Sequence, residues 1–325
     1  MSDETIGSGD ILDKKDFGVP LLVGIENPDP FFTEDQLVLT HQLDLKPDAE
    51  EDAIILHEVI GETPKGIILI QNNYFHYFTD FIGPVYAFIN NCIHLNINDV
   101  NIIGVDLDAE NSIAESFFPF LEHCLEQFSD RINISYTTIS ENIFNVGFGE
   151  PFIKINKSRI IDQRDIGTSI DFIYESAKSF SEIPEEAVPS KKVFISRKND
   201  LAKDATDSRT LYEEECEQFF SSIGFEIVNG EGFESIKDEI SYFRDASVLV
   251  GMTGSGLTNS MFMNPGQTVV EIVCPIKFTD EQKYEIHNFY KTISMLKKHK
   301  YVAVQNINSS QEDLLEQLAA VANML

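Results

Sequence analysis

The stretch Val248-Leu-Val-Gly-Met-Thr-Gly-Ser-Gly-Leu-Thr-Asn259 decides the fold, because it joins a buried strand to a helix through a glycine turn. Its apolar start suits a strand covered on both faces of a parallel sheet. Glycines at such a turn let the backbone approach a ligand, and the N–H groups of the following helix attract an anion such as a diphosphate. Glycine turns also join strands to helices where no ligand binds. The stretch therefore predicts an α/β fold. It predicts a phosphate site only if other residues near the turn also favour an anion.

Strands and helices alternate on both sides of this turn, which predicts parallel sheets covered by helices on both faces. A helix over 75–92 should kink at Gly83-Pro84, and Ser309-x-x-Glu312 is the expected capping box of the last helix. Strands are expected at 66–70, 101–105, 132–138, 192–196, 225–228, 247–250, 268–273 and 301–304. Helices are expected at 75–92, 114–128, 211–222, 235–243, 279–298 and 313–324, and a short helix after the glycine turn is expected to end at residue 263.

A linker is expected at residues 181–190, which contain two prolines and three glutamates. It would separate an N-terminal α/β domain, residues 1–185 with an irregular N-terminal arm, from a C-terminal α/β domain, residues 190–325. The last helix could pack back on the first domain. The fold class predicted in this way is α/β with two Rossmann-like domains that face a cleft.

The charge excludes whole classes of partner. The 325 residues include 24 Lys and Arg against 54 Asp and Glu, a net charge of −30. Nucleic acids and anionic membranes need a basic face, so neither is an expected partner. No apolar run is long enough to cross a bilayer, and the N-terminus is acidic, which together predict a cytoplasmic protein. The four cysteines have no spacing typical of zinc sites or disulfides.

The distribution of charge is informative about ligands. Residues 66–130 hold nine acidic residues and no Lys or Arg, whereas residues 191–209 hold six basic residues and three acidic ones. A basic island in so acidic a chain suggests a bound anion, although a solvated loop would look the same. The base-free first half favours a neutral acceptor over an anionic one.

An ordered set of motifs surrounds the glycine turn and resembles glycosyltransferase family 61, a group also called domain of unknown function 563. Before the turn come Val193-Phe-Ile-Ser-Arg197, Arg209 with Glu213-Glu214-Glu215, Ile223-Gly-Phe225, and Glu231 with Glu239-Ile240; after it come Phe262-Met-Asn-Pro-Gly266 and Val269-Val-Glu-Ile272. In the N-terminal half, Asn73-x-x-His76-x-x-x-Asp80 is similar to the family's His and Asp region.

The resemblance implies a hexosyl- or pentosyltransferase of the two-domain GT-B kind that inverts the sugar and needs no metal or other cofactor. It implies a nucleotide sugar, usually a UDP-sugar, as donor on the C-terminal domain. The acceptor, a glycan or other hydroxyl compound, would lie on the N-terminal domain, and assembly of a surface polysaccharide is a possible role. Three positions depart from the family pattern: Thr253 replaces the usual histidine, Ser255 replaces alanine, and Tyr212 or Glu213 stands in place of the usual asparagine.

These roles fall on particular residues. Arg197 and Arg209 are the candidates for the donor phosphates, together with the turn, and Glu271 for the ribose. His76 and Asp80 lie one helical turn apart after a strand, so they are the candidates for the catalytic base. The turn residues assigned to the nucleotide sugar are Gly254, Ser255, Gly256, Leu257, Thr258 and Asn259.

Other interpretations of the same sequence stay open. Glu271 follows Gly251 by 20 residues, as in a nicotinamide-dependent oxidoreductase, although the glycine spacing differs from G-x-G-x-x-G. No lysine follows the glycines, which argues against a P-loop. Asp106-Leu-Asp108 could hold a divalent cation, while a catalytically silent sugar-binding relative would also fit Thr253.

Overall fold

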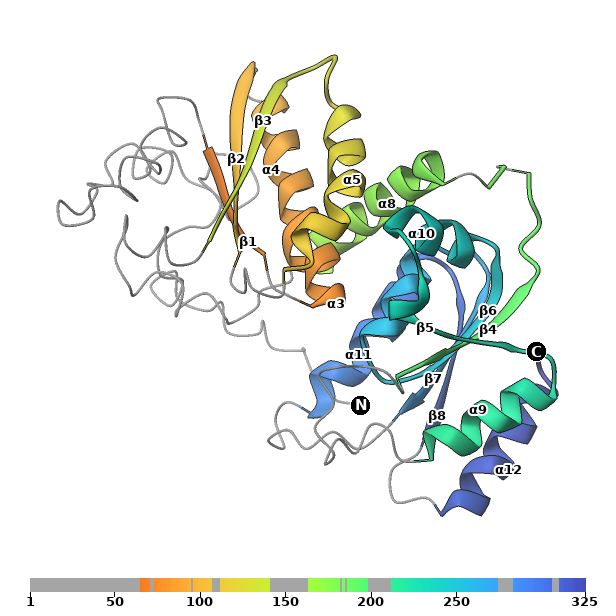
Figure 1. Cartoon of the computed structure of the whole chain (residues 1–325). Coiled ribbons are helices and arrows are strands. Elements are labelled where there is room, and N and C mark those ends of the chain that lie inside the picture. Colours follow the sequence, from red (N-terminus) through yellow and green to blue (C-terminus); the bar gives the residue numbers. More distant parts are fainter. Residues whose placement is uncertain are drawn as a thin grey trace, which may run out of the picture. The chain divides into compact units, whose positions relative to one another are not determined.

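The structure is a computed structural model in which the chain forms α/β units built on parallel sheets (Figure 1). It describes residues 65–70, 73–94, 96–106, 112–140, 163–181, 183–184, 186–197, 212–273, 283–305 and 310–325. The expected N-terminal arm, Arg209, Asp108 and most of the basic island lie outside the described residues. None of the described helices has the length and apolarity that crossing a membrane requires.

Contacts divide the chain into two compact units, and the first is built on a three-stranded sheet. Its strands, β1 (Lys65–Ile70), β2 (Asp99–Asp106) and β3 (Asn133–Ser140), pair in parallel in the order β1-β2-β3. All three predicted strands of this region are confirmed. The buried hydrophobic side chains described in this unit are Ile68, Ile70, Phe88, Ile89, Cys92, Val100, Ile102, Ile103, Val105 and Ile132.

The second unit is built on a five-stranded parallel sheet in the order β5-β4-β6-β7-β8. Numbered along the chain within this sheet, that order is 2-1-3-4-5, an order typical of doubly wound folds. The predicted strands are confirmed: β4 (Lys191–Ser196), β5 (Glu226–Asn229), β6 (Ala246–Met252), β7 (Thr268–Val273) and β8 (Lys300–Gln305).

Helices cover both faces of the larger sheet. On one face, α9 (Glu213–Ser222) and α12 (Gln311–Ala322) pack against alternate strand residues such as Val250, Met252 and Ile272. Figure 1 shows these two helices side by side. On the other face, α11 (Lys283–Leu296) and the 3-10 helix η6 (Ser255–Met261) contact the strands, and α10 (Ile236–Arg244) contacts η6. The last helix therefore packs on its own sheet, and its capping box is formed by Ser310 and Asp313, one residue later than predicted.

The second unit also contains segments that come before the linker, unlike the predicted division at residues 185–190. They are α3 (Tyr74–His76), the π-helix η2 (Tyr77–Ile82), the start of α4 (Gly83–His94), α5 (Ala114–Glu126) and α8 (Gln163–Phe180). Their aromatic faces pack on the residue that follows η6: the rings of Phe78 and Phe120 lie 5.2 and 6.3 Å from Phe262. Alternation along the chain predicts the helices at 75–92 and 114–128 but not the surface that their apolar faces cover, and α8 was not predicted.

The kink predicted at Gly83-Pro84 is a π-helical turn. Proline has no N–H, so Pro84 cannot bond the carbonyl of Asp80, which an α-helix would require. The N–H of Gly83 bonds the carbonyl of Phe78, five residues earlier. The wide turn that results carries Asp80, and π-helical turns are common at functional sites.

Candidate functional site

The order of the strands in the five-stranded sheet reverses between β4 and β6. In a doubly wound sheet, ligands bind outside the carboxyl ends of the strands at this switch point. Arg197 directly follows β4, and Gly254 follows β6 after one intervening residue, Thr253. The sequence-predicted residues Arg197 and Gly254 therefore both lie where the topology favours a ligand.

The side chain of Arg197 lies directly against Gly254. A Cβ atom built on Gly254 would overlap the guanidinium of Arg197. Gly254 has a φ of 168°, an extended conformation that any residue adopts, so the need for glycine comes from the close approach and not from the backbone angle. The guanidinium of Arg197 thus places a cation beside the turn at the carboxyl end of the sheet, as a diphosphate site requires.

Two acidic residues of α9 fix the end of β4 next to this arginine. The backbone N–H of Arg197 donates to the carboxylate of Glu213, and the hydroxyl of Ser196 donates to Glu217 Oε1 at 2.5 Å. Glu213 is 5 % exposed and begins α9. Sequence reasoning placed Glu213 in a motif but did not predict this anchoring role, because the contact spans residues far apart in the chain.

The glycine turn is only partly open. Ser255 and Gly256 are half-buried, whereas the side chains of Leu257 and Thr258 are fully buried. The N–H of Leu257 donates to the carbonyl of Gly254 at 3.0 Å, so it is not an open amide for a phosphate. Because this amide is engaged and η6 is a 3-10 helix of seven residues, the part of the turn that a ligand could reach is the half-buried pair Ser255 and Gly256, next to Arg197.

Thr253 and Glu271 form a buried hydrogen-bonded pair beneath the turn. Thr253 donates to Glu271 Oε1 at 2.6 Å, and the hydroxyl of Tyr301 donates to Oε2 at 2.5 Å. Burial raises the pKa of Glu271, and these two hydrogen bonds partly oppose the rise. Glu271 is 0 % exposed, so contact with a ribose would require it to exchange one of these bonds.

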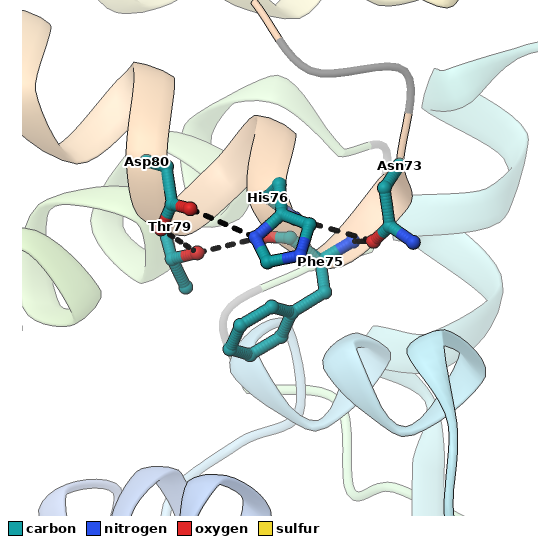
Figure 2. Close-up of polar contacts among 5 residues, drawn as sticks. All are labelled: Asn73, Phe75, His76, Thr79 and Asp80. Atoms are coloured by element: carbon teal, nitrogen blue, oxygen red, sulfur yellow. Dashed lines mark hydrogen bonds and ion pairs between the residues drawn. The ribbon is translucent and has the colours of Figure 1, made fainter. Parts of the chain in front are cut away.

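His76 and Asp80 form the predicted pair on one helix face (Figure 2). Nδ1 of His76 lies 2.8 Å from Oδ2 of Asp80, and the hydroxyl of Thr79 donates to Oδ1 of Asp80 at 2.7 Å. Asn73 caps the helix by accepting from the backbone N–H groups of Phe75 and His76. A carboxylate only accepts hydrogen bonds, so in the arrangement in which Asp80 is charged, Nδ1 of His76 donates to it and Nε2 is the nitrogen without a proton.

A hydrogen-bonded network connects the segment that carries His76 and Asp80 to the glycine turn within the second unit. It consists of Tyr74, Asn259 and Glu239. The hydroxyl of Tyr74 donates to Asn259 Oδ1 at 2.7 Å, and Nδ2 of Asn259 donates to Glu239 Oε1 at 3.1 Å. Burial raises the pKa of Glu239 to about 7, and the hydrogen bond from Asn259 partly opposes this rise. Burial and the nearby Glu239 also hold the pKa of Tyr74 well above its ordinary value. Sequence reasoning missed Tyr74, and quoted Glu239 only as part of a motif.

The stability of Glu239→Gln relative to the wild type should rise between pH 4.5 and pH 8. The raised pKa means that folded Glu239 binds a proton more tightly than the unfolded chain between pH 4.5 and about 7, so wild-type stability falls as the pH rises through this window. The glutamine does not titrate, so the change in relative stability should be roughly 3 kcal/mol from pH 4.5 to pH 8.

Urea unfolding at both pH values measures this difference. Glu234→Gln replaces an exposed carboxyl and should shift stability by no more than about 0.5 kcal/mol at either pH. A stability difference between Glu239→Gln and the wild type that did not change with pH would contradict the raised pKa of Glu239.

The competing metal motif is only half described. Asp106 ends β2 in the first unit and is 4 % exposed, and Asp108 lies outside the described residues. Within the part of the chain that the structure describes, no three His, Cys, Asp or Glu side chains gather as a metal site would require.

Comparisons with known proteins add a family. The sequence model described as Glycosyltransferase 61 matches residues 74–270, more than half of the chain. The match includes both the His76-Asp80 pair and the glycine turn. A comparison with the curated proteins gave no match.

One solved structure among the similar ones is an alpha/beta-galactoside alpha-2,3-sialyltransferase from the luminous marine bacterium Photobacterium phosphoreum. The identity is 10 % over 83 % of this chain and 85 % of that chain, with a TM-score of 0.22. A likeness this low supports no conclusion about fold or activity.

Proposed function

Because this chain belongs to glycosyltransferase family 61, we propose that it moves a sugar from a UDP-sugar to a hydroxyl acceptor with inversion and without a metal. Membership makes the chain a glycosyltransferase, which requires a sugar donor and an acceptor. The donor class, the inversion, the two-domain GT-B arrangement and a role in polysaccharide assembly belong to the proposal.

The observation that carries the donor site is the guanidinium of Arg197 against Gly254 at the strand-order switch point. As the bond between the sugar and the diphosphate breaks, its electron pair moves to the diphosphate, and a fixed cation stabilises the negative charge that develops. Thr253, which stands where the family has histidine, is 1 % exposed and donates to Glu271, so its hydroxyl is not available to a phosphate. The positive charge at the turn therefore depends on Arg197.

The pair His76 and Asp80 supports a general-base role. When the acceptor oxygen attacks the anomeric carbon, its proton moves to Nε2 of His76, and the carboxylate of Asp80 stabilises the imidazolium that forms. The hydroxyl of Thr79 holds the second carboxylate oxygen of Asp80, which fixes the carboxylate toward the imidazole. Both residues precede the linker, yet they lie in the second unit with the turn.

A thermal-shift screen with nucleotide sugars tests the proposal. UDP and UDP-sugars should raise the melting temperature more than GDP- or CMP-sugars, and UDP release from the best donor should continue in EDTA. A shift with NADH and none with UDP would overturn the proposal in favour of an oxidoreductase.

Arg197→Ala should weaken UDP binding by about 10- to 100-fold, the usual loss for a charged hydrogen-bonding group at a phosphate. Isothermal titration calorimetry with UDP measures the loss. Lys191→Ala is the matched control, because Lys191 starts the same strand at its other end and pairs there with Asp245 at 3.7 Å. Equal affinities for the wild type and Arg197→Ala would remove Arg197 from the donor site.

A further inference from the structure

The side chain of Asn259 is held on every side by hydrogen bonds inside the second unit. Its Oδ1 accepts from the hydroxyl of Tyr74 at 2.7 Å, and its Nδ2 donates to Glu239 Oε1 at 3.1 Å and to the carbonyl of Gly256 at 3.2 Å. Asn259 is 1 % exposed and Glu239 is 5 % exposed. A buried amide with both donors and its acceptor engaged has a single orientation.

The three residues come from three elements, so the network joins segments far apart in the chain. Tyr74 begins α3, Glu239 lies in α10 and Asn259 lies in η6. Tyr74 precedes His76 by two residues, and Asn259 bonds the backbone of the glycine turn through Gly256. The network therefore links the helix that carries the candidate base to the turn that carries the candidate donor site.

Ring packing already holds α3 in place, so the hydroxyl of Tyr74 contributes a directional hydrogen bond that fixes the orientation of α3. The ring of Tyr74 packs edge-on against Phe78 at 5.2 Å and Phe117 at 5.5 Å. Apolar contacts of this kind tolerate small rotations, whereas a hydrogen bond fixes the orientation of its partners. Removing the hydroxyl keeps the ring contacts and releases only the directional bond.

We infer that Tyr74 and Glu239 are positioning residues for glycosyl transfer, which act through Asn259 to fix the His76 helix against the glycine turn. The inference rests on the proposed function, because it assigns the base to the helix and the donor to the turn. Misplacing reacting groups by about 1 Å can cost on the order of 100-fold in rate. The two residues thus affect the chemical step without contacting either substrate.

Tyr74→Phe in the full chain tests this inference. Turnover is followed as UDP release from the UDP-sugar that gives the largest thermal shift, and donor binding by calorimetry with UDP. We expect kcat to fall by about 10- to 100-fold, while the Kd for UDP changes by less than about threefold. Tyr242→Phe is the matched control, since Tyr242 lies in α10 and donates to Glu226 at 2.7 Å on the surface.

A second pair of variants separates positioning from folding. Glu239→Gln keeps an acceptor for Asn259 and should retain kcat, whereas Glu239→Ala should lose as much as Tyr74→Phe. The double variant of Tyr74→Phe and Glu239→Ala should be no slower than either single one, because both act through Asn259.

Three results would overturn the inference. They are an unchanged kcat in Tyr74→Phe, failure of Glu239→Gln to retain the rate, and a parallel loss of melting temperature and UDP binding, which would indicate a purely structural role. If the wild type itself binds no UDP, the proposed function fails. If it binds UDP and Tyr74→Phe turns over normally, only this inference fails.

Discussion

Asp80→Asn should slow glycosyl transfer by a factor of about 10² to 10⁴, the largest effect expected from one substitution in this chain. Asparagine keeps the size of the side chain but removes the charge that stabilises a protonated His76. Its amide can also donate to Nδ1, which would move the ring proton to Nε2 and remove the basic atom. Initial rates of UDP release measure the effect, and UDP affinity should stay unchanged because Asp80 does not contact the donor in this mechanism.

The control for this variant is Asp130→Asn, which removes an exposed carboxyl and should leave the rate unchanged. The melting temperature of Asp80→Asn separates a catalytic loss from a folding loss, since Asp80 is also bonded by Thr79. Full turnover by a folded Asp80→Asn protein would rule out the pair as the base.

Gly254→Ala should weaken UDP binding by about 10- to 100-fold and leave the fold intact. The new methyl group would overlap the guanidinium of Arg197, which is the far end of a flexible side chain. The guanidinium can move away at little cost to stability, but it then leaves the position at which it meets a phosphate. The backbone angle of 168° is one that alanine adopts freely.

Two comparisons make this prediction specific. Gly230→Ala adds a methyl group where no atom lies within 4 Å, so it should change neither stability nor UDP affinity. In the background of Arg197→Ala, the change of Gly254 to alanine should cost little more, since the group that it displaces is already gone. Additive losses in the double variant would show that Gly254 acts by another route.

The sequence was a good guide to the strands and to the residues that follow their carboxyl ends. Strand β7 begins and ends where predicted, and Arg197 and Gly254, which the sequence assigned to one ligand, lie in contact. Such features depend on local apolar runs and on the rule that ligands gather at these ends. They can be predicted from the sequence because an apolar run and the residues at its carboxyl end lie next to one another in the chain.

The partners of these residues could not be read in the same way. Asn259 depends on Tyr74, 185 positions away, and the carboxylate of Glu213 reaches the backbone of Arg197 across 16 positions. No spacing rule links such pairs, because the packing of whole helices decides them. For the same reason the sequence assigned α3 and α5 to the first domain, although their aromatic faces pack in the second unit.

The second unit is discontinuous along the chain, and this affects its synthesis. Tyr74 and Asn259 are separated by 185 positions. At about 5 to 20 residues per second, a ribosome needs roughly 10 to 40 s to make the chain between them. During that time the aromatic faces of α3 and α5 have no Phe262 to cover them. The His76 helix is thus among the first described segments to be made, yet its docking partners are among the later ones, so nascent chains of intermediate length are the form of this protein most exposed to aggregation.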